Sequence, residues 1–292
     1  MSRFFNRIQD ASRDRPRLED SRSPDRPFRV LTLANNKGGI GKTTLAANLA
    51  VHIRALREDL PILVIGLDDQ NTLDRVFAID DRPRPNVLNG LRAGGFEGVV
   101  CEGQYGIHYV PSCDDIAPAK RLVRELFDLQ VMLDRTAWHG LVILDTKSDF
   151  EILTQNALVA SDLVLVIVKD RASLHQSAKL FRLLEECGRP RDGARVLLSM
   201  VDRRIRLDRP GGEDVLGMLI TEIRRRGYPL LESFVSHSPK IASLESDPSD
   251  TLLPVAIGAR RSVIHRQLLH AANDVLKLLD QAGLPRSTAL SA

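Results

Sequence analysis

The chain alternates short runs of apolar residues with segments in which apolar residues recur at helical spacing. Such alternation is typical of a parallel sheet whose strands are joined by crossover helices. Several runs are apolar throughout, as expected for strands covered on both faces. We therefore expect an α/β fold, a doubly wound and mostly parallel sheet with helices on both faces. Its strands are predicted at residues 29–34, 62–67, 107–110, 141–145, 163–168, 196–200 and 230–235.

Helical patterns follow most of these runs, and the last pattern has the clearest apolar stripe. Ile264, Leu268 and Ala271 lie at helical spacing, and Val275 and Leu278 continue the stripe. A face of this kind packs against a core. Helices are predicted over residues 45–56, 114–135, 151–160, 173–187, 213–226 and 261–279.

Length and composition fit a single large globular unit. The chain has 292 residues, of which 43% are hydrophobic and 27% charged, and its formal net charge is +3. This charge is too small to indicate a polyanionic partner by itself. Residues 1–27 contain little apolar material after residue 8 and are expected to be a disordered tail. The folded domain is predicted at 28–281, followed by a flexible tail at 282–292.

The cysteines and the apolar runs limit the class of protein further. Cys101, Cys113 and Cys187 show no Cys-x-x-Cys spacing, so the sequence favours neither a zinc site nor a disulfide framework. No apolar stretch approaches the roughly 18 residues that span a bilayer, and the N-terminus lacks the apolar core of a signal peptide. The sequence therefore predicts a cytoplasmic protein.

A glycine-rich turn at residues 35–44, Asn-Asn-Lys-Gly-Gly-Ile-Gly-Lys-Thr-Thr, separates the first predicted strand from a helical pattern. Its glycines let backbone N–H groups point at phosphate oxygens, and the following helix adds its positive N-terminal end. The turn predicts a nucleotide-triphosphate loop in which Lys42 neutralises the β- and γ-phosphates and Thr43 binds Mg²⁺. The nucleotide-binding residues are expected to be Lys37, Gly38, Gly39, Ile40, Gly41, Lys42, Thr43 and Thr44.

Acidic residues at two predicted strand ends complete a candidate site. Phosphoryl transfer needs a metal, charge stabilisation and a positioned water, and ligands of doubly wound sheets bind at the strands' carboxyl ends. Asp145 ends an apolar strand in the manner of a carboxylate that holds Mg²⁺. Asp68 ends another strand, where it either orients the metal and the attacking water or caps a helix.

The loop resembles the deviant Walker A loop of the ParA/MinD/Soj family, in which an additional lysine, here Lys37, reaches the phosphates of a partner subunit. Gly66-Leu-Asp-Asp-Gln is similar to that family's Asp-x-Asp-Pro-Gln element, with Asp68 at its second Asp. Similar blocks begin at Gly106, Leu158 and Val196. The resemblance covers roughly residues 28 to 280 and is closest to short ParA/Soj-type ATPases.

This resemblance implies that ATP and Mg²⁺ are cofactors of a P-loop NTPase. It assigns catalytic roles to Lys37, Lys42 and Asp68, and metal binding to Thr43, Asp68 and Asp145. It also implies an ATP-dependent homodimer, nonspecific DNA as a surface, a stimulating adaptor that is ParB-like or cargo-bound, and a place at the nucleoid. Stable membrane insertion is not expected, because residues 281–292 lack the mixture of lysines and bulky apolar residues of an amphipathic anchor.

The chain departs from the family at two places. Thr146-Lys147-Ser148 stands where the family has x-Pro-Pro, and Gly66 replaces the first Asp. We expect a slow, partner-stimulated ATPase, and an ATP-binding regulator with little turnover stays open as an alternative. A MinD-like membrane ATPase is disfavoured by the chain's end, and an iron–sulfur protein by the cysteine positions.

Arginines gather in one stretch of the sequence. Between residues 203 and 226 there are seven arginines and four acids, a local balance of 7 − 4 = +3. Such a cluster is often a solvated face, and arginines at a helix C-terminus offset its dipole. Because relatives bind DNA through exposed basic residues, DNA binding is predicted for Arg203, Arg204, Arg224, Arg225 and Arg226.

Overall fold

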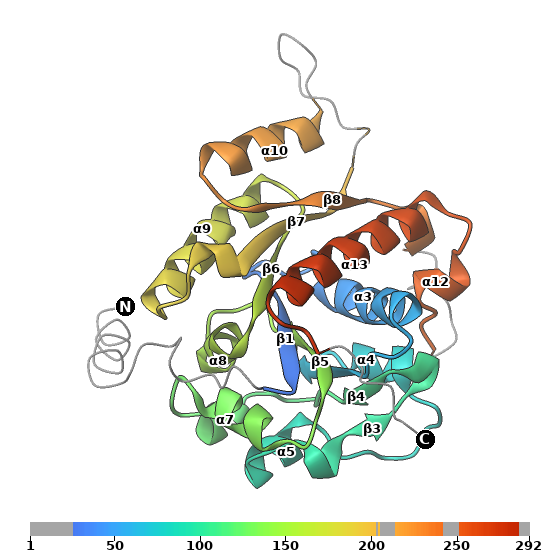
Figure 1. Ribbon diagram of the computed structural model, residues 1–292, viewed down its shortest axis with the longest axis vertical. Coiled ribbons are helices and arrows are strands. Elements are labelled where there is room, and N and C mark those ends of the chain that lie inside the picture. The colour runs from blue at the N-terminus through green and yellow to red at the C-terminus, as the bar shows by residue number, and fades with distance from the viewer. Residues whose placement is uncertain (1–25, 203, 205–213, 242–250, 286–292) are drawn as a thin grey trace.

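The computed structural model describes residues 26–202, 204, 214–241 and 251–285. Within them, one eight-stranded sheet runs through the molecule (Figure 1). Its strands are β1 (Phe28–Ala34), β2 (Ile62–Leu67), β3 (Cys101–Glu102), β4 (His108–Val110), β5 (Gly140–Thr146), β6 (Leu163–Val168), β7 (Ala194–Val201) and β8 (Leu230–Ser236). The helices are α3 (Lys42–Leu56), α4 (Thr72–Phe77), α5 (Val87–Ala93), α6 (Ala119–Leu122), α7 (Asp128–Arg135), α8 (Ile152–Ala160), α9 (Arg171–Glu186), α10 (Val215–Arg225), α12 (Val255–Gly258) and α13 (Val263–Gln281).

The strands are ordered β3-β4-β2-β5-β1-β6-β7-β8, and every pairing is parallel except the edge pair β3–β4. Strand β1 lies between β5 and β6. Strands β2 to β5 lie on one side of β1 and strands β6 to β8 on the other, so the strand order reverses beside β1. In parallel strands the carboxyl ends share one edge of the sheet, and ligands bind where the order reverses. The loops after β1, β2 and β5 therefore meet at one place.

Helices cover both faces of the sheet (Figure 1). One face packs against α3, α4, α12 and α13 in a core that includes Leu49 and Leu268. The opposite face packs against α5, α7 and α8 around Phe96, and against α9 and α10 around Phe181. Strands β2, β5 and β6 are buried along their whole length, which explains their uninterrupted apolar sequences. The predicted fold class is confirmed.

All seven predicted strands are present, but the single helix predicted over 114–135 is wrong. The segment forms α6 and α7, which are separated by residues 123–127, and the first of these, Val123, is extended. Polar side chains satisfy the backbone in the break. The Asp128 carboxylate accepts hydrogen bonds from the N–H groups of Arg124 and Glu125, both at 2.8 Å, and the Asn156 amide donates to the Glu125 carbonyl at 3.0 Å. Local hydrogen bonds of this kind compete with the helix.

The ends of the described fold are anchored by side chains. Arg26 forms an ion pair with Asp134 at 2.8 Å and lies over the Phe28 ring at 4.1 Å. At the other end, Leu284 is buried beyond α13, and the Arg29 guanidinium donates to the Ala282 carbonyl at 2.6 Å. Most of the predicted tails, residues 1–25 and 286–292, lies outside the described residues. None of the described helices is both long and apolar enough to cross a bilayer.

Candidate nucleotide site

The predicted phosphate loop is the turn between β1 and α3. Gly39 and Gly41 have φ of 66° and 81°, in the left-handed region that favours glycine. A Cβ on Gly41 would also approach the Met200 sulfur to 2.7 Å. Gly41 is the N-cap of α3, so the N-terminal N–H groups of this 15-residue helix begin directly after the turn. This arrangement is suited to binding an anion.

The turn forms one wall of a cavity of about 520 Å³. Residues 38–44 supply that wall. Residues 68–70 after β2 and residues 146–148 at the end of β5 supply the others, and α4 contributes Thr72 and Arg75. The three loops are those that the strand order brings together. The cavity therefore contains every residue of the predicted nucleotide-binding set except Lys37, which lies beside it.

Lys42 lies among carboxylates at the base of this cavity. Only 6% of its surface is exposed, and its ammonium donates to the Ser148 hydroxyl at 2.5 Å and to the Lys37 carbonyl at 3.5 Å. Burial lowers the pKa of Lys42, and the charges of Asp145, Asp68 and Asp149 oppose that effect. The ammonium is positioned to neutralise an anion that enters the cavity.

The two predicted metal-binding carboxylates, Asp68 and Asp145, are both buried. Neither oxygen of Asp145 has a hydrogen-bond partner among the described residues. Burial, together with the charge of Asp68, raises the pKa of Asp145 to about 7. Asp68 accepts a hydrogen bond from the Thr43 hydroxyl at 3.4 Å, and burial raises its pKa. Unsatisfied buried carboxylate oxygens are costly, and carboxylate and hydroxyl oxygens suit a hard divalent cation, so the residues fit Mg²⁺.

Gly66, where the sequence lacks the expected first Asp, is enclosed by its neighbours. A Cβ at this position would lie 2.9 Å from the Ser112 Cβ, 3.1 Å from the Ser112 nitrogen and 3.1 Å from a Leu73 methyl group. Contacts below 3.0 Å require the surroundings to move. No acidic side chain fits here without such a movement, so Asp68 and Asp69 are the acids available at the end of β2.

The carboxyl end of β5 and the residues after it, 146–148, depart from the family pattern and are held by three contacts. The Thr146 hydroxyl donates to the Leu33 carbonyl at 2.8 Å. Lys147 forms an ion pair with Asp69 at 2.6 Å, and the hydrogen bond raises the pKa of Lys147 and lowers that of Asp69. Ser148 accepts the bond from Lys42 described above. The positive charge of Lys147 is thus directed at Asp69.

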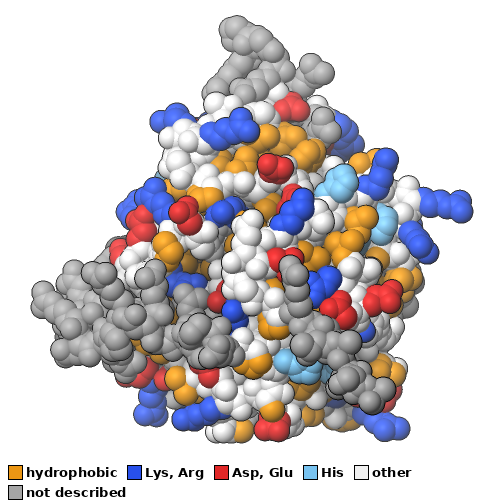
Figure 2. Space-filling model, in the orientation of Figure 1, with side chains coloured by type: hydrophobic (Ala, Val, Ile, Leu, Met, Phe, Trp, Pro, Cys, Tyr) orange, Lys and Arg blue, Asp and Glu red, His pale blue; other side chains and the backbone are white. Residues whose placement is uncertain are grey.

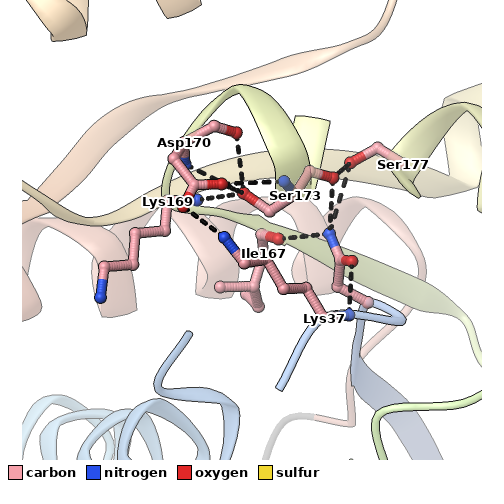
Figure 3. A network of polar contacts seen from close by, with 7 residues as sticks. Lys37, Ile167, Lys169, Asp170, Ser173 and Ser177 are labelled. Atoms are coloured by element: carbon pink, nitrogen blue, oxygen red, sulfur yellow. Dashed lines mark hydrogen bonds and ion pairs between the residues drawn. The ribbon is translucent and has the colours of Figure 1, made fainter. Parts of the chain in front are cut away.

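Lys37 is turned onto its own subunit and pairs with Asp170 at the N-terminus of α9 (Figure 3). The Asp170 carboxylate is itself held by a capping box with Ser173, whose N–H it accepts at 2.9 Å. Burial favours the neutral form of Asp170, but the bonds from Lys37 and Ser173 prevail and lower its pKa. Asn35 fixes the start of the turn, because its amide donates to the Ile167 carbonyl at 2.7 Å and its oxygen accepts the Lys37 N–H.

The predicted DNA-binding arginines do not form one patch in a single subunit. Arg204 follows the carboxyl end of β7, whereas Arg224, Arg225 and Arg226 precede the amino end of β8, and the two strands are parallel. Arg203 lies outside the described residues. On the face in Figure 2, basic side chains are interspersed with acidic ones.

Acidic neighbours also reduce the positive charge of these arginines. Arg225 and Arg226 each bind Glu222 at 2.7 Å and lower its pKa to about 2, while Arg204 binds Asp202 at 2.7 Å. No ion pair of Arg224 is found in the described part of the chain. Of the four described arginines, Arg204, Arg224 and Arg225 are exposed and Arg226 is half-buried. Three of the four carry an acidic partner.

Contacts that join distant segments could not be predicted from the sequence. No motif marks Asp170, Asn35 or Met200 as functional, and Ser148 stands out only as a departure from the family pattern. Asp170-x-x-Ser173 is a capping pattern directly after an apolar strand, which was a usable signal. Nothing in the sequence pairs Asp170 with Lys37, because 133 residues separate them.

The fold and the site together define a class of protein, the α/β proteins that carry a P-loop at the carboxyl edge of a parallel sheet. A protein-family model described as an AAA domain matches residues 28–188. The chromosome partitioning protein ParA of Caulobacter vibrioides is 29% identical over 204 residues, which are 65% of this chain and 76% of that protein. The chromosome-partitioning ATPase Soj of Thermus thermophilus is 34% identical over 160 residues, 54% of this chain and 62% of that protein. The chain belongs to this AAA domain family and, within it, to the ParA/MinD/Soj group.

Solved structures show the same fold at low sequence identity. The septum site-determining protein MinD of Pyrococcus horikoshii, complexed with Mg-ADP, has a TM-score of 0.65 at 18% identity and covers 87% of this chain and 98% of its own. A plasmid partition protein of Borrelia burgdorferi bound to AMPPNP has a TM-score of 0.63 at 16% identity, with coverages of 85% and 98%. These similarities support the shared architecture.

Proposed function

We propose that this protein is an ATPase that binds ATP with Mg²⁺, dimerises in the ATP-bound state, binds DNA without sequence preference and positions or segregates a large cargo. The observation that carries the proposal is that Lys42, Thr43 and Asp68 line one cavity at the N-terminus of α3, with the buried Asp145 close to Lys42 and Asp68. Two relatives with partitioning names, ParA of Caulobacter vibrioides and Soj of Thermus thermophilus, support it.

Each group in the cavity has a chemical role in this proposal. The N–H groups of residues 38–44 and the Lys42 ammonium would hold the phosphates, because both present positive charge to the same space. Thr43, Asp68 and Asp145 would hold Mg²⁺, which when bound neutralises phosphate charge. Asp68 would also orient the attacking water, since its carboxylate lies at the cavity wall beside Thr43.

Lys37 would act between subunits. It lies beside the cavity and outside its lining, and its side chain is 34% exposed, as is 38% of the Asp170 side chain. An ion pair this exposed contributes only about 0–1 kcal/mol. Exchange of Asp170 for a phosphate of a second subunit would therefore cost little, which supports an ATP-dependent homodimer.

We propose further that the protein binds DNA at the nucleoid and that an adaptor protein stimulates it. Arg224, and the arginines that share Glu222, lie at the exposed C-terminal end of α10. A dimer would present this end twice, and contacts of arginine with phosphate give affinity without sequence preference. A ParB-like or cargo-bound protein would stimulate turnover.

An ATP-binding regulator with little turnover is a second candidate. The packing around Gly66 favours it, because that position has no room for the acid expected there. A single-turnover assay of phosphate release from ATP separates the two candidates. An ATPase releases phosphate while its ATP-bound dimer forms and dissociates, and a regulator releases none in that time.

Both candidate functions require that the cavity binds Mg-ATP, and this binding can be measured. In isothermal titration calorimetry, Lys42→Ala should weaken affinity by at least about tenfold, because a charge-assisted hydrogen bond contributes roughly 1.5–3 kcal/mol. Lys277→Ala removes a lysine that is mostly exposed on α13 and serves as the matched control. Equal affinities for the parent and Lys42→Ala would refute the site.

A further inference from the structure

The hydroxyl of Ser148 lies directly opposite the phosphate loop. Its oxygen accepts a hydrogen bond from the Lys42 ammonium at 2.5 Å, and a Cβ placed on Gly38 would be 3.9 Å from it. Ser148 therefore faces both the lysine and the first glycine of the loop across the cavity. A group this close to the Lys42 ammonium is also close to any phosphate oxygen that binds the same ammonium.

Among the described residues, the Ser148 hydroxyl accepts one hydrogen bond and donates none. A serine hydroxyl donates one hydrogen bond and accepts up to two. Lys42 uses one acceptor position, and no acceptor for the Ser148 O–H is found among the residues that the structure describes. The unused donor belongs to a half-buried residue that lines the cavity.

Neighbouring contacts fix where Ser148 lies. Thr146 is tied to the Leu33 carbonyl on β1, and Lys147 is tied to Asp69 beyond β2. The backbone on the N-terminal side of Ser148 is thus held from both neighbouring strands. On its C-terminal side, Asp149 accepts hydrogen bonds from the Glu151 N–H at 3.0 Å and the Thr154 hydroxyl at 2.8 Å. The hydroxyl is held in place by ordered contacts on both sides.

We propose that Ser148 is a specificity-determining residue that distinguishes a nucleoside triphosphate from a diphosphate. Its hydroxyl donates to the terminal phosphate when that group is present and serves as a bonding partner of Lys42 when it is absent. The inference rests on the proposed function, because it takes the cavity to be the nucleotide site. A proline at this position would have neither a hydroxyl nor an N–H to donate.

The experiment compares two ligands in calorimetry, the non-hydrolysable AMPPNP and ADP, each with Mg²⁺. Ser148→Ala should weaken AMPPNP binding by about tenfold, the scale of one hydrogen bond to a charged group, and ADP binding by less than about twofold. Ser148→Thr keeps the hydroxyl and should restore the parental ratio of the two affinities. Ser233→Ala is the matched control, because that hydroxyl is buried without a hydrogen-bond partner on the edge strand β8.

The possible outcomes distinguish a failure of the role assigned to Ser148 from a failure of nucleotide binding itself. Equal losses for both ligands in Ser148→Ala, or no loss for either, would show that the hydroxyl does not read the terminal phosphate, while the nucleotide site stands. Failure of Ser148→Thr to restore the ratio would also overturn it, provided that the thermal unfolding of this variant matches that of the parent. A parent that binds neither ligand would reject the proposed function and this inference together.

Discussion

Single residues at this site are constrained by close packing as well as by chemistry. Gly66 shows this most clearly, because it stands where the resemblance leads one to expect an acid. From the sequence alone, the glycine is a missing acid and a reason to expect slow hydrolysis. The structure shows that a Cβ here would meet Ser112 and Leu73, so the close approach of the segment after β4 and of α4 to β2 requires a small residue.

A substitution at Gly66 should therefore reduce stability. Gly66→Ala is expected to lower the free energy of unfolding by about 1–3 kcal/mol, the usual cost of overpacking a core. Urea denaturation measures this change. Gly98→Ala is the matched control, since a Cβ there meets no atom within 4 Å. Equal stabilities for the two variants would show that the contacts around Gly66 relax freely.

Among the elements, those with a strong local signal were predictable. The strands could be predicted because buried parallel strands are apolar throughout, and α13 because its stripe is regular. The break between α6 and α7 was only partly local: Asp128 binds the N–H groups of Arg124 and Glu125, but Asn156, from another helix, holds the Glu125 carbonyl. The sequence was enough to predict that the phosphate loop, Asp68 and Asp145 lie near one another. It was not enough to predict the ion pairs Lys37–Asp170 and Lys147–Asp69, because each joins loops far apart in the chain.

The C-terminal end of α10 provides an element-level test of DNA binding. Charge reversal of Arg224 and Arg225 should abolish the ATP-dependent binding of arbitrary duplex DNA, whereas Glu222→Gln should strengthen it by releasing two arginines from their acidic partner. Fluorescence anisotropy at several salt concentrations measures both effects, with a log–log slope of about −0.9 per phosphate neutralised.

Charge reversal of Arg82 and Arg92, which are exposed far along the chain from α10, is the control for net charge. Loss of binding in this control as well would indicate a general charge effect instead of a surface on α10. Sedimentation of the ATP-bound parent with anionic liposomes, without any DNA shift at low salt, would assign the surface to a membrane.

At the scale of the whole molecule, one sheet brings the site together. Strands β1, β2 and β5 lie side by side, so three loops separated in sequence form a single cavity. Lys37 is the one predicted nucleotide-binding residue outside that cavity, and its side chain stays with Asp170 of the same subunit. In the proposed dimer, the Lys37 of a second subunit completes the nucleotide site.

The mass of the protein in solution shows whether ATP and Lys37 together form a dimer. Light scattering coupled to size-exclusion chromatography should give the chain mass of 32.5 kDa with Mg-ADP and twice that mass with Mg-AMPPNP. Lys37→Ala should bind AMPPNP but remain at the single-chain mass, and Lys277→Ala should behave as the parent. If the parent keeps one mass with both nucleotides, or if Lys37→Ala doubles its mass as the parent does, the ATP-dependent dimer built on Lys37 is contradicted.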